Sequence, residues 1–398
     1  MMRSILFVDD DGKVLRGLKR MLFPFAGLWQ TEFAGSGAEA LAILGKRTFD
    51  VMVADLRMPE MNGAQLLAEV AVRFPQMVRI VLSGTLEQDL RLQAALSAHQ
   101  YLSKPCSPEV LKATLDRTFA LRDLLVEPGL RELISRTTSL PSTPAIYVTL
   151  MQAVRRTEVT IQEIAAVLAQ DAGMTAKILQ LVNSSAFGIQ RQITNPEDAV
   201  LLLGIDSIRA LALSASAFSM FRTHMCQRFS IAVFQEHSAA VASLAQAVAK
   251  SRNVPKPAMD DAFAAGLLHD VGKLILASNY PDKYEQLLAE AATGDRKITQ
   301  LEREVFGTTH AEVGSYLLWL WGLPDTVVEA VAFHHNPSRC PDNSFGPLTA
   351  VHVADVLEHE ITDGAPAAQT SLDNAFLTRI GMAGEVPAWS SLAKEQRS

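Results

Sequence analysis

One stretch near the N-terminus decides the fold of the first part of the chain: Ile5-Leu6-Phe7-Val8-Asp9-Asp10-Asp11. Four apolar residues followed at once by three aspartates are typical of a buried strand that ends at a polar site. The acidic residues are the reverse of the basic start of a signal peptide. Similar β-rich runs recur, with helical patterns interleaved, at Thr31–Ala34, Val51–Ala54, Arg79–Ser83 and Gln100–Leu102.

Five strands that alternate with helices predict a parallel, doubly wound α/β sheet. Ligands of such sheets bind where the strands end. At those ends stand three carboxylates, a hydroxyl and an ammonium group, from Asp9, Asp10, Asp55, Ser83 and Lys104. Clustered aspartates repel one another unless a cation joins them, and Mg²⁺ prefers carboxylate, water and phosphate oxygens. The sequence therefore predicts a Mg²⁺ site at which a carboxylate accepts a phosphoryl group.

The motifs that hold these residues resemble the receiver domain of bacterial response regulators. They are Ile5-Leu6-Phe7-Val8-Asp9-Asp10, Asp55-Leu56-Arg57-Met58-Pro59-Glu60-Met61-Asn62-Gly63, Ser83-Gly84 and Lys104-Pro105. The resemblance implies a flavodoxin-like sheet in which Asp55 accepts the phosphoryl group from a histidine kinase. It implies that Mg²⁺ is held by Asp9, Asp10, Asp55 and the backbone carbonyl of Arg57. It also implies that the phosphoryl oxygens contact Ser83 and Lys104, and that Tyr101 is the aromatic switch residue.

From Ser107 onward the pattern is helical, and no further strand is predicted. We expect residues 1–120 to form the receiver domain, 121–138 a helical connector and 139–385 an all-helical output domain. Residues 386–398 are rich in Ser, Lys, Glu and Gln, and we expect them to fray.

Seven of the nine histidines lie after residue 230, several of them in Ala- and Leu-rich helical surroundings. A histidine buried there needs a partner, which either a metal or an ordinary hydrogen bond supplies. Imidazoles and aspartates on neighbouring helices can enclose a divalent transition metal, which would activate water against a phosphodiester. A buried hydrogen-bond network that fixes helix packing is the alternative. The candidate residues are His237, His269, Asp270, His310, His334, His335 and Asp355.

The order His, His-Asp, Asp resembles the HD superfamily of metal-dependent phosphohydrolases. On that resemblance the core ligands are His237, His269, Asp270 and Asp355. The other three histidines fit the extra ligands of two-metal members, and Lys273 matches a lysine that supports catalysis.

Several short motifs narrow the resemblance to the HDOD domain, the HD-related output domain of bacterial signalling proteins. They include Leu140-Pro141-Ser142-Thr143-Pro144, Gly266-Leu267-Leu268-His269-Asp270 and Trp321-Gly322-Leu323-Pro324. Members of that family are generally regarded as non-catalytic. HD-GYP phosphodiesterases carry Gly-Tyr-Pro after their paired histidines, where this chain has Asn336-Pro337-Ser338-Arg339.

Composition sets wider limits on the class of protein. The length of 398 residues predicts two or three domains. A hydrophobic content of 48% supplies enough apolar residues for folded cores. The net charge of −7 shows no basic footprint, so we expect no DNA partner. The three cysteines form no CxxC motif, and no apolar stretch is long enough to span a membrane. These features predict a cytoplasmic protein in a reducing compartment.

The leading hypothesis is a two-component response regulator, phosphorylated by a histidine kinase, whose output domain contacts a downstream protein. The first alternative is a metal-dependent phosphohydrolase gated by the receiver, with a cyclic dinucleotide among its candidate substrates. The second is a nucleotide-binding sensor without turnover. A homodimer is expected because receivers often pair.

Overall fold

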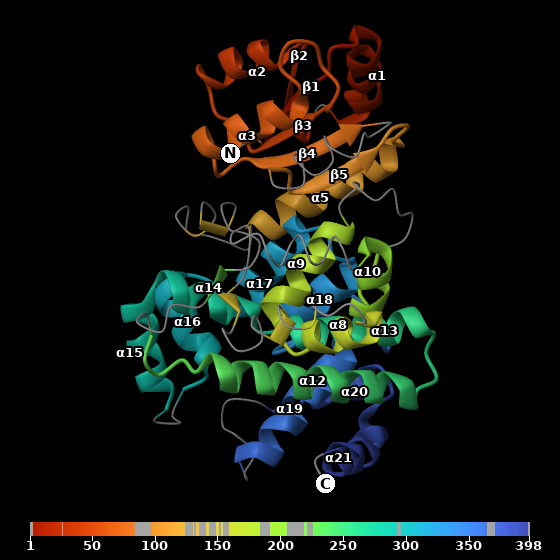
Figure 1. The fold of residues 1–398 in the computed structure, drawn as a ribbon, viewed down its shortest axis with the longest axis vertical. Helices are drawn as coiled ribbons and strands as arrows, with labels where there is room; N and C mark the ends of the chain where they lie inside the picture. Colours follow the sequence, from red (N-terminus) through yellow and green to blue (C-terminus); the bar gives the residue numbers. More distant parts are fainter. Residues whose placement is uncertain are drawn as a thin grey trace. The chain divides into compact units, whose positions relative to one another are not determined.

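The computed structural model describes two compact units, whose main boundary lies between residues 138 and 139. The described residues are 3–25, 27–83, 97–123, 130, 133–134, 141–142, 149–150, 153, 159–183, 192–204, 219–220, 226–292, 296–363 and 371–396. The first unit begins in red in Figure 1, and most of the second is drawn in green and blue.

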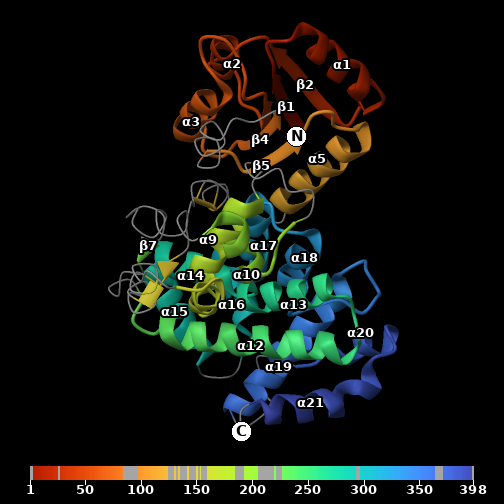
Figure 2. The same ribbon diagram turned by 45° about the vertical axis from the view of Figure 1, so that its right-hand side comes forward.

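The first unit is built on five parallel strands in the order β2-β1-β3-β4-β5. Their bounds are β1 Arg3–Val8, β2 Trp29–Ala34, β3 Val51–Ala54, β4 Val78–Ser83 and β5 Gln100–Ser103. The helices are α1 Gly12–Leu22, η1 Phe23–Phe25, α2 Gly37–Leu44, α3 Gly63–Arg73 and α5 Pro108–Asp123. Figure 2 shows α2 and α3 on one face of the sheet and α1 and α5 on the other. The predicted doubly wound sheet is confirmed.

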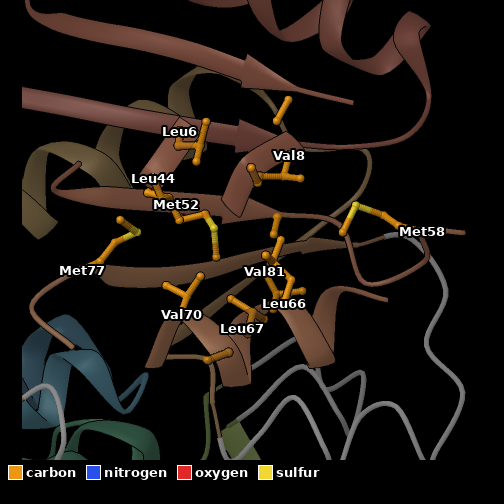
Figure 3. Close-up of a cluster of buried hydrophobic side chains, with 14 of the residues drawn as sticks. Leu6, Val8, Leu44, Met52, Met58, Leu66, Leu67, Val70, Met77 and Val81 are labelled. Atoms are coloured by element: carbon orange, nitrogen blue, oxygen red, sulfur yellow. The ribbon is translucent and has the colours of Figure 1, made fainter. Parts of the chain in front are cut away.

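The central strands are buried on both faces, which is why they read as continuous apolar runs. All four residues of β3 are buried. Figure 3 shows Met52 and Val81 of the sheet facing Leu66, Leu67 and Val70 of α3. This packing holds the strand ends, and the side chains that follow them, in fixed positions.

The second unit is almost entirely helical. Its helices are α8 Ile161–Leu168, α9 Ala172–Asn183, α10 Pro196–Leu203, α12 Ile231–Ser251, α13 Lys256–Leu268, α14 Val271–Asn279, α15 Pro281–Ala291, α16 Ile298–Phe306, α17 His310–Leu320, α18 Asp325–Phe333, η3 Pro337–Arg339, α19 Pro347–Asp363, α20 Asn374–Arg379, η4 Ala383–Glu385 and α21 Val386–Glu395. The expectation of no strand after Ser107 is wrong in one detail. Two-residue strands, β6 Pro141–Ser142 and β7 Ser219–Met220, pair in parallel. Pairs this short carry no alternating pattern that a sequence could reveal.

Two glycines allow the helices of this unit to approach closely. A Cβ atom on Gly266 of α13 would lie 2.7 Å from the Cα of Ala242 on α12. A Cβ atom on Gly272 of α14 would lie 1.9 Å from the carbonyl oxygen of His310, the first residue of α17. Only a hydrogen fits at either position, so these contacts bring the histidine-bearing helices together.

The receiver boundary at residue 120 stays a prediction, and α5 runs across it to Asp123. The expectation for the C-terminal segment is wrong. Residues 386–395 form α21, although the segment 386–398 was expected to fray. Trp389 and Ala393, one helical turn apart, are buried, and Trp389 Nε1 donates a hydrogen bond to Ser251 Oγ at 3.1 Å. Two serines lie between these anchors and a run of polar residues follows Ala393, so the apolar spacing is hidden in the sequence.

Across the described residues, no helix combines the length and the apolar character needed to cross a bilayer.

Candidate functional site

The first site lies where β1 and β3 end. Asp9 directly follows β1 and Asp55 directly follows β3, and their backbone amides still donate to the neighbouring strands, to Ala34 and Val8. Lys104 Nζ lies 2.5 Å from Asp9 Oδ2 and 3.3 Å from Asp55 Oδ1. The sheet therefore brings residues from three separate motifs to one edge.

The carboxylates of this site are close enough to share a cation. One oxygen from each of Asp9, Asp10 and Asp55 lies within 4.8 Å of the others. Burial, together with the nearby charge of Asp9, raises the pKa of Asp55 although Lys104 opposes the rise. Mg²⁺ prefers this kind of donor set and would relieve the repulsion between the carboxylates.

Gly63 explains how the start of α3 fits beside Asp55. A Cβ atom at this position would lie 2.0 Å from the carbonyl oxygen of Asp55. The amide of Gly63 donates instead to the carbonyl of Leu56 at 2.9 Å. The glycine of the sequence motif thus fixes the backbone that follows Asp55.

Three expectations for this site are not tested. The side chains of Ser83 and Tyr101 lie outside the described part of the structure. The contact of Ser83 with phosphoryl oxygens and the switch role of Tyr101 therefore stay predictions. The Mg²⁺ contact of the Arg57 carbonyl also stays a prediction.

The second site gathers all seven predicted histidines and aspartates. His237 lies on α12, and His269 and Asp270 form the junction between α13 and α14. His310 is the first residue of α17, and Asp355 lies in α19. His334 and His335 directly follow α18. Six helices therefore supply one cluster.

The cluster divides into two potential ligand groups that adjoin at Asp270. His237, His269 and Asp355 form the first group, and Asp270 and the three remaining histidines form the second. In the first group, His237 Nε2 lies 3.2 Å from Asp355 Oδ1 and 3.3 Å from His269 Nε2. Asp270 faces both groups, since its Oδ2 lies 3.4 Å from His269 Nε2.

In the second group, Asp270 Oδ1 lies 3.1 Å from His310 Nε2 and 3.8 Å from His334 Nε2. His335 Nε2 lies 3.0 Å from His310 Nε2. Lys273 Nζ contacts Asp270 Oδ2, which places the predicted supporting lysine beside both groups.

Four of the imidazole rings are oriented from outside the cluster. The Nδ1 atom of His237 lies 2.6 Å from Glu358 Oε2, and that of His310 lies 2.7 Å from Glu302 Oε2. The Nδ1 atoms of His269 and His334 lie 2.7 and 2.8 Å from backbone carbonyl oxygens of their own helices. With every Nδ1 engaged, the four Nε2 atoms are directed into the cluster. Such outer partners are the usual means of orienting metal-binding histidines.

The electrostatics of the cluster reflect the close packing of its histidines and carboxylates. Burial disfavours a charged His269, but Asp270 and Asp355 outweigh it and raise the pKa of His269 to about 10. Burial and the charge of His269 lower the pKa of His334 to about 3. The pKa values of Asp270 and Asp355 are held well below their usual range, against burial, by the histidines around them. The two carboxylates and the histidines of the cluster are therefore strongly coupled electrostatically.

The donor set fits a divalent transition metal. His334 Nε2 is buried and makes no hydrogen bond, although it faces Asp270 Oδ1 at 3.8 Å. An unsatisfied buried polar atom costs about 1–3 kcal/mol. A cation between these atoms would satisfy both, and imidazole with carboxylate suits Zn²⁺, Fe²⁺ or Mn²⁺.

Comparison with known families identifies both parts of the chain. A family model of the response regulator receiver domain matches residues 5–116, and a family model of the HDOD domain matches residues 140–337. The chain is a response regulator with an HDOD output domain. Neither matched family is described as a DNA-binding domain.

Individual relatives match different shares of the chain. The crystal structure of the MmoQ response regulator from Methylococcus capsulatus is 28% identical, covers 63% of this chain and 96% of its own, and superposes with a TM-score of 0.50. An uncharacterized protein of Treponema pallidum is 24% identical over 59% of this chain and 46% of its own length. The transcriptional regulator NtrC of Escherichia coli is 34% identical over 30% of this chain and 26% of its own length. The chain thus spans from about a quarter to about half of the curated relatives it matches.

Sequence reasoning missed three residues of the HDOD site. Glu302 and Glu358 orient ligand histidines, and His359 Nε2 lies 3.5 Å from Asp355 Oδ1. A partial signal existed for two of them, because residues three and four positions after Asp355 share its helix face. No spacing signal links Glu302 to His310, because a loop and a change of helix separate them.

Proposed function

We propose that this response regulator is switched by phosphorylation of Asp55 by a histidine kinase. The observation that carries the proposal is the convergence of Asp9, Asp55 and Lys104, with a half-buried carboxylate beside a fixed ammonium group. Mg²⁺ held by the aspartates would neutralise an incoming phosphoryl group, and Lys104 would pair with its oxygens. Phosphorylation would then shift the receiver between two conformations.

The test is phosphorylation of the full chain by acetyl phosphate with Mg²⁺, read by intact mass. We expect one phosphoryl group on the wild type and none on Asp55→Asn. Asp11→Asn is the matched control, because Asp11 is an exposed carboxylate at the same edge and lies outside the three-aspartate group. Equal labelling of Asp55→Asn and the wild type would refute the assignment.

For the output domain, the geometry supports a metal-dependent phosphohydrolase best. The observation in its favour is the complete pair of ligand groups that adjoin at Asp270. We propose that His237, His269, Asp270 and Asp355 hold one divalent metal, and that Asp270, His310, His334 and His335 hold a second. Metals bound there would lower the pKa of water and neutralise phosphate charge.

The chain's own residues would prepare the site for that chemistry. Glu302 and Glu358 hold ligand rings in place, and the surrounding helices exclude bulk water from all but the edge near His237 and His335. Lys273, held against Asp270, adds a positive charge that would attract a phosphate group. The leading hypothesis from the sequence, an output domain that only contacts a partner protein, needs none of these features.

Elemental analysis of the purified full chain separates these two outputs. We expect about two transition-metal ions per chain if both ligand groups fill, and none in the His269→Ala/Asp270→Ala variant. The metal-loaded protein should hydrolyse bis(p-nitrophenyl) phosphate. A metal-free wild type that cannot be loaded with Zn²⁺, Fe²⁺ or Mn²⁺ would refute the phosphohydrolase and leave partner binding as the output.

A further inference from the structure

A groove of about 430 Å³ lies beside the histidine cluster, entirely within the second unit. It is lined by residues from α16, α17, the end of α18 and η3. Three of the lining side chains are cationic, from Lys297, Arg303 and Arg339. This volume is within the range of small-molecule sites.

The groove continues into the cluster. A smaller recess of about 30 Å³ is lined by His334, His335 and Asp355, and it shares Lys297, Thr299 and His335 with the groove. The two spaces therefore adjoin at His335, and a ligand in the groove would lie directly beside the cluster.

The charged side chains of the groove that a ligand could pair with are positive. Its two carboxylates are already engaged, since Glu304 pairs with Arg296 and Glu312 pairs with Arg303. Lys297 and Arg339 are exposed and form no ion pair with any carboxylate in the described part of the chain. Two cations thus remain to bind an anion at the mouth of the recess.

The groove also offers apolar surface. Phe333, half-buried at the end of α18, lines it together with two alanines. An inorganic anion would use only the cations, whereas an organic phosphate would use both the cations and this apolar side. Arg339 ends the segment Asn336-Pro337-Ser338-Arg339, which stands where the sequence departs from Gly-Tyr-Pro.

We propose that this groove binds a small organic phosphate, with Lys297 and Arg339 pairing with phosphate oxygens and Phe333 packing against the organic part. Only one part of this inference rests on the proposed phosphohydrolase function, namely that the phosphate bound in the groove is the substrate. Binding itself requires the groove and not a metal.

The test is calorimetric titration of the full chain with phenylphosphonate, which carries the anion and a ring but no ester bond to hydrolyse. The titration uses both chelator-treated and metal-loaded protein. Lys297→Gln/Arg339→Gln should bind about tenfold more weakly, because two exposed charge pairs are lost. The matched control is Lys250→Gln/Arg379→Gln, which removes two exposed cations outside the groove and should bind like the wild type. Inorganic phosphate should bind more weakly than phenylphosphonate.

The outcomes separate the groove from the metal centre. If no metal binds but the binding of phenylphosphonate still requires Lys297 and Arg339, the proposed phosphohydrolase function is refuted and the proposed groove is supported. If metal binds and esters are hydrolysed while the Lys297→Gln/Arg339→Gln protein keeps wild-type affinity, the groove assignment is overturned. Equal affinity for phosphate and phenylphosphonate would overturn the role of Phe333.

Discussion

The contact between Gly272 and His310 gives a sharp test of how the HDOD site is assembled. Gly272→Ala would place a Cβ atom 1.9 Å from the carbonyl oxygen of His310, where real Cβ contacts are essentially never below 3.0 Å. The obstructing atom is backbone, so no side-chain rotation relieves the clash. Either α14 or the start of α17 must move by about 1 Å, in a region packed to near-crystalline density.

The expected loss of stability of Gly272→Ala can be estimated from the effect of adding a methyl group to other packed protein cores. Inserting a methyl group into a packed core destabilises by about 1–3 kcal/mol, and a backbone clash belongs at the upper end of that range. For a domain of this size each kcal/mol lowers Tm by roughly 2–4 °C, so Gly272→Ala should lower Tm by roughly 6–12 °C. The same shift would separate His310 from Asp270 and weaken the second metal group.

Thermal unfolding followed by circular dichroism measures this effect. Gly384→Ala is the matched control, because a Cβ atom there meets no atom within 4 Å, and its Tm should stay within about 1–2 °C of the wild type. A Gly272→Ala protein with wild-type Tm and wild-type metal content would show that the close approach of α14 and α17 is not needed to build the site.

Three further changes test separate parts of the structure. Glu302→Gln should weaken metal binding by about 10–100-fold, because the ring of His310 loses its carboxylate partner, and titration against a competing chelator measures this. Trp389→Ala should cost about 3–5 kcal/mol, measured by urea unfolding, if α21 is an integral part of the domain; a cost near zero would restore the expectation of a frayed tail. Although burial opposes it, Arg122 lowers the pKa of Asp50, so this pair stabilises the receiver above about pH 4 and loses its contribution as the pH falls further. Asp50→Asn should therefore flatten the acid side of the stability curve, and an unchanged acid midpoint would contradict this reasoning.

The receiver site was largely predictable because one topological rule acts on it. Parallel strands end at one edge, so a run such as Ile5–Val8 predicts both the strand and the location of Asp9. The HDOD cluster offered no such rule. Its seven candidate ligands were recognised through spacing that resembles a family, and only the folded helices show that the seven divide into two groups.

What the sequence could not reveal depends on contacts between segments far apart in the chain. Glu302 and Glu358 are ordinary acidic residues of helical segments until the fold places them against His310 and His237. Trp389 lies in a polar segment, and the partner of its indole nitrogen, Ser251, lies 138 positions earlier in the chain. Periodicity describes one helix at a time and gives no information on such partners.

The structure also bears on the choice between a metal centre and a hydrogen-bond network. A network that served only to fix helix packing would pair its buried atoms, because each unpaired one costs about 1–3 kcal/mol. Here Nδ1 of His334 is paired with a backbone carbonyl, while Nε2 of the same ring points at Asp270 Oδ1 across 3.8 Å with no hydrogen bond. Burial keeps that ring neutral, so its inward nitrogen has a free lone pair at neutral pH. A neutral, oriented imidazole facing a carboxylate is a poor hydrogen-bond pair and a good pair of metal ligands, which is why the cluster favours the metal.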